Sequence, residues 1–122
     1  MAIKQAQLTT TQLDLLTVPE GSTQAITNII VCNTYSPFGA SPETRDAAFT
    51  MYIVKGVDAS TPGAIGPVST VVKDLILPAG ETFTFDSERI VLEAGDMISF
   101  ETQLTSGPGA TDLSATVSYL EV

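Results

Sequence analysis

The sequence contains no histidine, no tryptophan and one cysteine among its 122 residues. Without histidine, the chain lacks the most frequent general base and the most frequent transition-metal ligand. The single cysteine, Cys32, excludes a disulfide within the chain, so the fold must be held by packing. We therefore expect no enzymatic activity, no catalytic residue, and neither a cofactor nor a metal ion.

Positive charge is also scarce, since five Lys and Arg stand against 14 Asp and Glu, for a net charge of −9. Binding to nucleic acid needs clustered cations against the phosphates, and binding to anionic membranes needs a basic surface. We expect neither partner. No apolar run approaches the roughly 18 residues of a spanning helix, and the first residues do not form a signal peptide. These features favour synthesis in a cytoplasm and a chain that stays soluble until it is assembled.

What the sequence does contain is a repeating pattern of short strands. Two-residue alternation between turn signals is typical of strands in an antiparallel sheet. It is clearest from Ala47 to Ile53, where Thr50 and Tyr52 occupy the opposite, wetter face, and it recurs over 98–104 and 113–119. The more uniformly apolar runs 26–32 and 68–77 indicate central strands or strands covered on both faces. Shorter strands are predicted at 6–9, 14–18, 82–86 and 89–92.

Tight turns separate these strands. Pro19-Glu20-Gly21 and Pro78-Ala79-Gly80 share one form, and a third turn lies at 93–96. No segment has the apolar spacing of a long helix, although one helical turn fits 42–46. The sequence thus predicts an all-β fold, an antiparallel β-sandwich of about eight strands, jelly-roll or immunoglobulin-like. Residues 1–122 form one domain, with 1–12 as an arm or edge strand.

We predict that the core is built mainly by the apolar residues on one face of each strand. They are Ile29, Val31, Phe49, Met51, Ile53, Leu75, Phe83, Phe85, Ile98, Phe100, Val117 and Tyr119.

The most informative segment outside the predicted core is the long connection from Asn33 to Asp46. It carries Tyr35, Phe38 and Arg45, which belong to the residue types enriched at protein interfaces. Its two prolines lower the entropy lost on docking. We predict contact with a neighbouring chain through these three residues, supported by 56–67 and 105–112. The alternative is a long hairpin loop with Phe38 packed on its own sandwich.

Other candidate sites give weaker signals. The chain has no histidine and no evident helix that could activate Cys32 as a catalytic nucleophile, so we interpret Cys32 as a small buried hydrophobe. Asp58 with Ser60, and Asp86 with Glu88, approach the spacing of cation ligands but do not continue into a calcium-binding loop. The carboxylates also lack the aromatic cleft that glycoside hydrolysis requires.

Several segments resemble small structural proteins in the virions of tailed bacteriophages, especially of the cyanophage type. The similar stretches are Ala2–Ala6, Leu16–Gly21, Ile26–Asn33, Leu77–Glu81, Val91–Ile98 and Ala115–Val122. This resemblance spans most of the chain and consists of strands and turns. It implies a virion location after assembly in the host cytoplasm, with no catalytic residues.

The resemblance favours a capsid decoration, or cement, subunit that acts through protein–protein contacts. Its partners would be further copies of itself, as a homo-oligomer such as a trimer, and major capsid or tail proteins. The alternatives are a neck, tail, baseplate or fibre component and, more distantly, a carbohydrate- or receptor-binding β module, for which Tyr35 beside Asn33 is the only hint.

Overall fold

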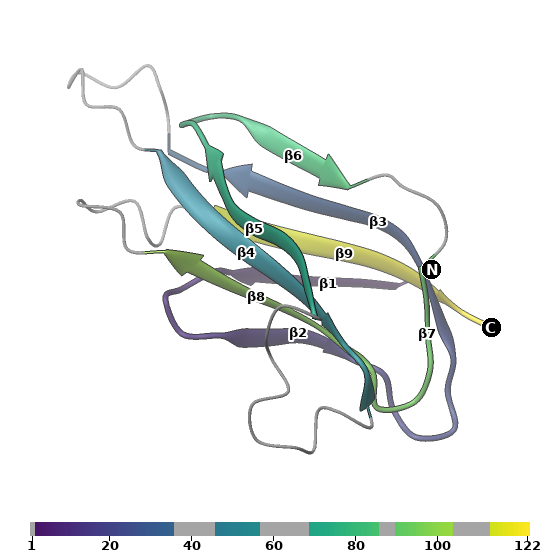
Figure 1. Ribbon diagram of the computed structural model, residues 1–122. Helices are drawn as coiled ribbons and strands as arrows, with labels where there is room; N and C mark the ends of the chain where they lie inside the picture. The colour runs from purple at the N-terminus through teal and green to yellow at the C-terminus, as the bar shows by residue number, and fades with distance from the viewer. Residues whose placement is uncertain (1, 36–45, 57–68, 86–89, 104–112) are drawn as a thin grey trace.

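The computed structural model describes residues 2–35, 46–56, 69–85, 90–103 and 113–122, and its nine regular elements are all β-strands (Figure 1). They are β1 (Ala2–Gln7), β2 (Leu13–Thr17), β3 (Gln24–Asn33), β4 (Ala47–Val54), β5 (Thr70–Leu77), β6 (Thr82–Phe85), β7 (Ile90–Leu92), β8 (Met97–Gln103) and β9 (Leu113–Glu121). The helical turn expected at 42–46 falls on residues that lie, apart from Asp46, outside the described part of the chain.

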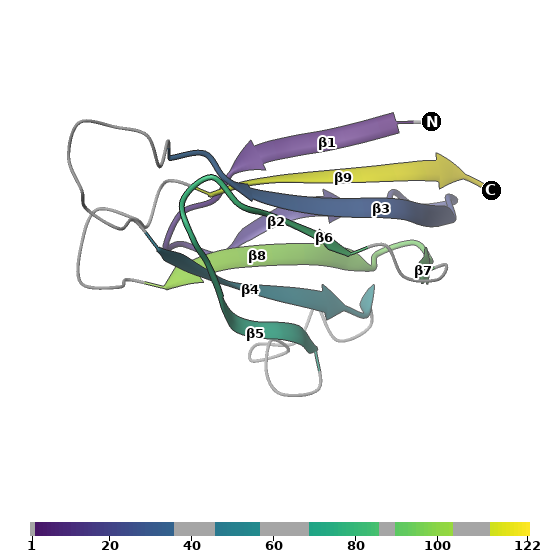
Figure 2. The ribbon, with the colours of Figure 1, turned by 90° about the horizontal axis from the view of Figure 1, so that it is seen from above.

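Two antiparallel sheets face each other, which confirms the predicted sandwich (Figure 2). Sheet A has the strand order β1-β9-β3-β6, with β7 also paired to β3, and sheet B has the order β2-β8-β4-β5. The pairs are nested, because β4 pairs with β5, β3 with β6 and β7, β2 with β8, and β1 with β9. The chain is therefore one long antiparallel ribbon rolled into two layers.

This strand order decides between the two sandwich types left open by the sequence. An immunoglobulin-type sandwich keeps its first two strands in one sheet. Here β1 lies in sheet A and β2 in sheet B, and the nested pairing is that of a jelly roll. The segment 2–7, as β1, lies at an edge of sheet A and pairs with β9, so the two ends of the chain meet.

The core lies between the sheets and draws on both of them. Phe49 and Phe100 are fully buried with ring centroids 6.5 Å apart, and Phe83 of the opposite sheet lies 5.7 Å from Phe49. The predicted core residues are confirmed as buried or as packed against the buried cluster. The predicted core list omitted Leu8 and Leu113, which are also fully buried, although alternation places Leu113 on the apolar face of its strand. Leu8 follows β1, where the chain crosses to the other sheet and the strand pattern is lost.

Two expectations about sheet B were wrong. The run 68–77 was expected to be a central strand or one covered on both faces, but β5 is an edge strand with Val71 and Ile76 exposed. Its pairing with β4 shifts where Asp74 adopts a φ of 47°, a left-handed conformation that an aspartate tolerates at a bulge. A bulge of this kind breaks the regular row of unpaired groups and so protects an edge against unwanted pairing.

The second error concerns the outer face of β4, which the alternation predicted to be exposed to solvent. Thr50 and Tyr52 are instead buried, with exposed fractions of 0% and 6%. The Thr50 hydroxyl donates to an Asp74 carboxylate oxygen at 3.2 Å and accepts the Asp74 N–H at 3.1 Å. Tyr52 reaches from β4 to the Glu101 carboxylate on β8. Polar residues at these positions are therefore used for cross-strand bonds.

The turn signals in the sequence correspond to real turns. Glycines with positive φ occur in all three, at Gly21 (78°), Gly80 (77°) and Gly95 (87°). A backbone hydrogen bond closes each turn, for example from Ser22 N–H to Pro19 O at 3.2 Å. Because only glycine adopts this conformation without strain, these three positions fix where the ribbon reverses direction.

A bulge in β3 buries a hydroxyl that has no hydrogen-bond partner. Ile26 and Ile29 both face the core, so the intervening Thr27 and Asn28 both face outward, and the pairing with β9 shifts there. The Oγ1 atom of Thr27 is buried without a partner. We expect Thr27→Val, which keeps the shape and removes the hydroxyl, to raise the free energy of unfolding by about 1 kcal/mol. Urea unfolding would measure this, and a loss of more than about 1 kcal/mol would show that the hydroxyl is satisfied.

Candidate functional site

The predicted docking segment begins at a rigid point of the sandwich. Of its three proposed contact residues, the structure describes Tyr35, which is half-buried, whereas Phe38 and Arg45 lie outside the described residues. Tyr35 lies two residues after the end of β3, and its N–H donates to the Asn33 side-chain oxygen at 3.1 Å. The segment that carries Tyr35 is therefore held at its first turn by Asn33.

Asn33 is the anchor of this end of the molecule. It is fully buried, and its side-chain N–H donates to Leu77 O at the end of β5 at 2.9 Å. Its backbone N–H donates to Glu81 O at 2.9 Å, and its backbone carbonyl accepts the Gly80 N–H at 3.1 Å. Asn33 thus joins β3, β5 and the β5–β6 turn. The sequence suggests Asn33 as a hint of sugar binding. In the structure, however, both the N–H group and the oxygen of its side-chain amide form hydrogen bonds within the chain.

Two of the three predicted docking segments are anchored at neighbouring positions on the sandwich. Asn33 pairs with Leu113, and Ala48 pairs with Gln103, so the anchors of 33–46 and of 105–112 adjoin at the left of Figure 1. We call this the Asn33 end. The third segment, 56–67, starts after β4, at the opposite end of that strand, where Val54 pairs with Met97. The chain therefore presents the anchors of two segments together and the anchors of the third apart.

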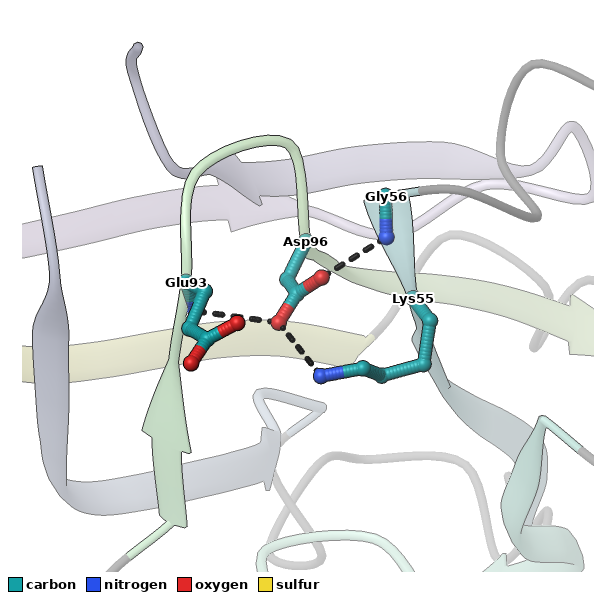
Figure 3. Close-up of polar contacts among 4 residues, drawn as sticks. All are labelled: Lys55, Gly56, Glu93 and Asp96. Atoms are coloured by element: carbon teal, nitrogen blue, oxygen red, sulfur yellow. Dashed lines mark hydrogen bonds and ion pairs between the residues drawn. The ribbon is translucent and has the colours of Figure 1, made fainter. Parts of the chain in front are cut away.

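The opposite end of the sandwich is fixed by Asp96, which is 2% exposed (Figure 3). Its carboxylate accepts the Gly56 N–H at 2.7 Å, the Glu93 N–H at 2.9 Å and the Lys55 ammonium at 3.0 Å. Gly56 packs so tightly on Gly95 that an added Cβ would lie 2.7 Å from the Gly95 carbonyl carbon. Asp96 therefore fastens the end of β4 to the turn before β8. The sequence predicted this turn but gave no indication of the structural role of Asp96.

The electrostatics of this corner fit a structural role. Burial acts to raise the pKa of the Asp96 carboxyl, but the N–H groups of Glu93 and Gly56 and the Lys55 ammonium outweigh it and lower that pKa. Asp96 is thus ionised at neutral pH with all its donors in place. A carboxylate saturated in this way is not available to act as a general acid or base.

On the outer face of sheet B, Tyr52 is the one residue with a strongly shifted pKa among those described. Burial, the hydrogen bond to Glu101, and the negative charges of Glu101 and Asp74 raise the pKa of Tyr52 to about 12. The phenol therefore stays protonated and donates to Glu101. Within the described ranges, no group of three or more His, Cys, Asp or Glu side chains is placed to hold a metal ion.

The interpretation of Cys32 as a buried hydrophobe is wrong, because its side chain is only half-buried. Its register explains the difference, because it lies opposite Ser114 and Thr82, on the outer face of sheet A. The neighbouring Val31 faces inward and is fully buried.

Comparison with known proteins adds no relative: no family model, no curated protein and no solved structure matches the chain. Among the described residues, there is no helix of the length and apolarity needed to cross a membrane.

Proposed function

We propose that this chain is a structural protein of a tailed-bacteriophage virion, a capsid decoration subunit that stabilises the head by protein–protein contacts. The observation that carries the proposal is the anchoring of the Asn33 end, where buried Asn33 fixes the start of the segment bearing Tyr35, Phe38 and Arg45. Binding residues are concentrated on connections held by a rigid scaffold. A docking loop on a fixed base loses less entropy when it binds.

The resemblance to virion proteins supports this function, because three of the similar segments contain turns that determine the fold. Leu16–Gly21, Leu77–Glu81 and Val91–Ile98 contain the three turns that reverse the ribbon. Jelly rolls occur in viral capsid proteins and also in lectins, so the fold alone is an analogy. Internal use of the Asn33 amide favours docking over carbohydrate binding, since sugar recognition would need that amide.

In this function, the partners are other copies of the chain and the major capsid protein. A neck, tail, baseplate or fibre position would use the same loops on a different neighbour. The net charge of −9 keeps the free subunit soluble before assembly. Contacts at the Asn33 end would then bury Tyr35 and Phe38, with Arg45 paired to a carboxylate of the neighbour.

Replacing residues 36–44 by a short Gly-Ser link tests the docking role. We expect the melting temperature to stay nearly constant, because the anchor contacts of Asn33 are retained. Occupancy on the particle should fall by about tenfold or more, which corresponds to about 1.4 kcal/mol of docking free energy. Quantitative mass spectrometry of purified particles measures the occupancy.

The matched control replaces residues 58–66, which leave from the opposite end of β4, by the same link. Its effect on occupancy should be smaller. A large loss of stability with normal occupancy for the 36–44 replacement would mean that Phe38 belongs to the core and that this loop does not dock. Micromolar binding of the isolated chain on a glycan array, lost in the same variant, would favour the carbohydrate-binding module instead.

A further inference from the structure

The outer face of sheet A carries no charged side chain over four adjacent strands. Inward-facing Val31, Ala115 and Val117 are fully buried, and the registers of the sheet fix which residues face the other way. These are the alternate residues from Ile3 to Gln7 in β1, Ser114 to Leu120 in β9, Asn28 to Cys32 in β3, and Thr82 to Thr84 in β6. We call this surface the neutral face. It consists of Ser, Thr, Asn and Gln, with Cys32 and a few aliphatic residues.

In this chain, 16% of residues are charged, so about two charged side chains would be expected among the residues of this face, and there is none. The outer face of sheet B shows the contrast, because Asp14, Asp74 and Glu101 all lie on its strands on that side. On the neutral face, Ile3 is 57% exposed and Leu120 is 41% exposed. No described strand lies over this face, which forms the upper layer in Figure 2. Depletion of charged residues is one feature of the centre of protein interfaces.

We infer that the neutral face binds the same face of a second copy of this chain, forming a two-fold dimer. Two copies that each carry −9 repel one another least where neither presents negative charge. Hydroxyl and amide side chains both donate and accept hydrogen bonds, so a face made of them is complementary to itself. Self-complementarity is the requirement of a two-fold interface, in which the same patch is used twice.

The dimensions of the face fit a small specific interface. The strands β1, β9, β3 and β6 have 6, 9, 10 and 4 residues, and at about 3.4 Å per residue and about 4.8 Å between strands they give a footprint of about 470 Å². Side chains corrugate this footprint, so the accessible surface approaches the ~600 Å² per partner at the low end of specific interfaces. Packing of the two faces at about 10 Å would place sheet A against sheet A, as in other stacked sheets. The inference adds a dimer to the proposed function, and its role in a virion rests on that proposed function.

Sedimentation equilibrium of the full chain tests the dimer over about 1–100 µM, the weak end of affinity for interfaces of this size. We expect the wild type to dimerise and Ile3→Glu to remain monomeric, because the substitution places like charges in the interface. The matched control is Ile76→Glu, since Ile76 is equally exposed (60%) but lies on β5 of sheet B. It should dimerise like the wild type. Thr116→Glu, in the middle of β9, provides a second disrupting variant.

The single cysteine gives an independent readout, because Cys32 lies on the neutral face. Its alkylation by iodoacetamide should slow as the protein concentration rises, and Ile3→Glu should remove this protection. A wild type that is monomeric throughout, a trimer, or a dimer that survives both Ile3→Glu and Thr116→Glu would overturn the inference. These measurements need no particle, so a dimer that is absent from virions would contradict only the proposed function.

Discussion

Phe100→Ala should lower the free energy of unfolding by about 3–5 kcal/mol. Phe100 is fully buried in the centre of sheet B, where it pairs with Leu13 of β2 and Met51 of β4. Its ring also contacts Phe49, with centroids 6.5 Å apart. Removing the ring leaves a cavity between two sheets that cannot collapse without disturbing both, which places the cost in the upper part of the range for core truncations.

Urea unfolding monitored by circular dichroism would measure this loss. The control is Ile76→Ala on β5, where the side chain is 60% exposed and the cost should stay below about 1 kcal/mol. Equal costs for the two variants would contradict the placement of Phe100 in the centre of the core.

Asp96→Ala should cost about 2–4 kcal/mol, because it leaves two backbone N–H groups without their acceptor. These are the N–H groups of Gly56 and Glu93, both bonded to a carboxylate that is 2% exposed. The ion pair with Lys55 adds little, since the lysine side chain is 59% exposed and its charge is screened by water. Thermal or urea unfolding measures the loss.

Glu93→Ala is the matched control for Asp96. It removes an acidic side chain three residues away but keeps the Glu93 backbone N–H that bonds to Asp96. We expect a change within about 0.5 kcal/mol, as for other surface substitutions. If the two variants were equally destabilised, loss of negative charge would explain the effect and the fastening role of Asp96 would be wrong.

The pH dependence of stability follows from the lowered pKa of Asp96. A carboxyl whose pKa is lower in the folded state contributes stability above its unfolded pKa, about 3.9. That contribution is lost as the pH falls through the folded pKa. The stability difference between wild type and Asp96→Asn should therefore be constant from about pH 7 to pH 5 and shrink below about pH 4.

The sequence predicted the two-layered architecture of this fold better than the order of the strands within each sheet. Alternation placed Phe49, Met51 and Phe100 correctly, because a strand with one buried face repeats every two residues. Alternation carries no information about which strands pair, and the jelly-roll order depends on the long-range pairing of β1 with β9. The same limit explains the error at β5, where an apolar run could not reveal that the strand lies at an edge.

Polar residues with internal roles were the hardest to predict. Thr50, Asn33 and Asp96 look like surface residues in the sequence, yet each is buried and bonded to a distant segment. Asn33 bonds to Leu77, 44 residues away, and Asp96 bonds to Gly56, 40 residues away, so no local pattern indicates these contacts. The neutral face was missed for a related reason: absence of charge over four strands becomes visible only when the register aligns them.

The central proposal, that this is a structural protein of a phage particle, is tested most directly by locating the chain in an electron-microscopy map of purified virions. We predict density for the jelly roll at symmetry-related positions on the capsid, with the Asn33 end against a neighbouring subunit. Complete absence of the chain from purified particles, while it is abundant in the infected cell, would contradict the proposal.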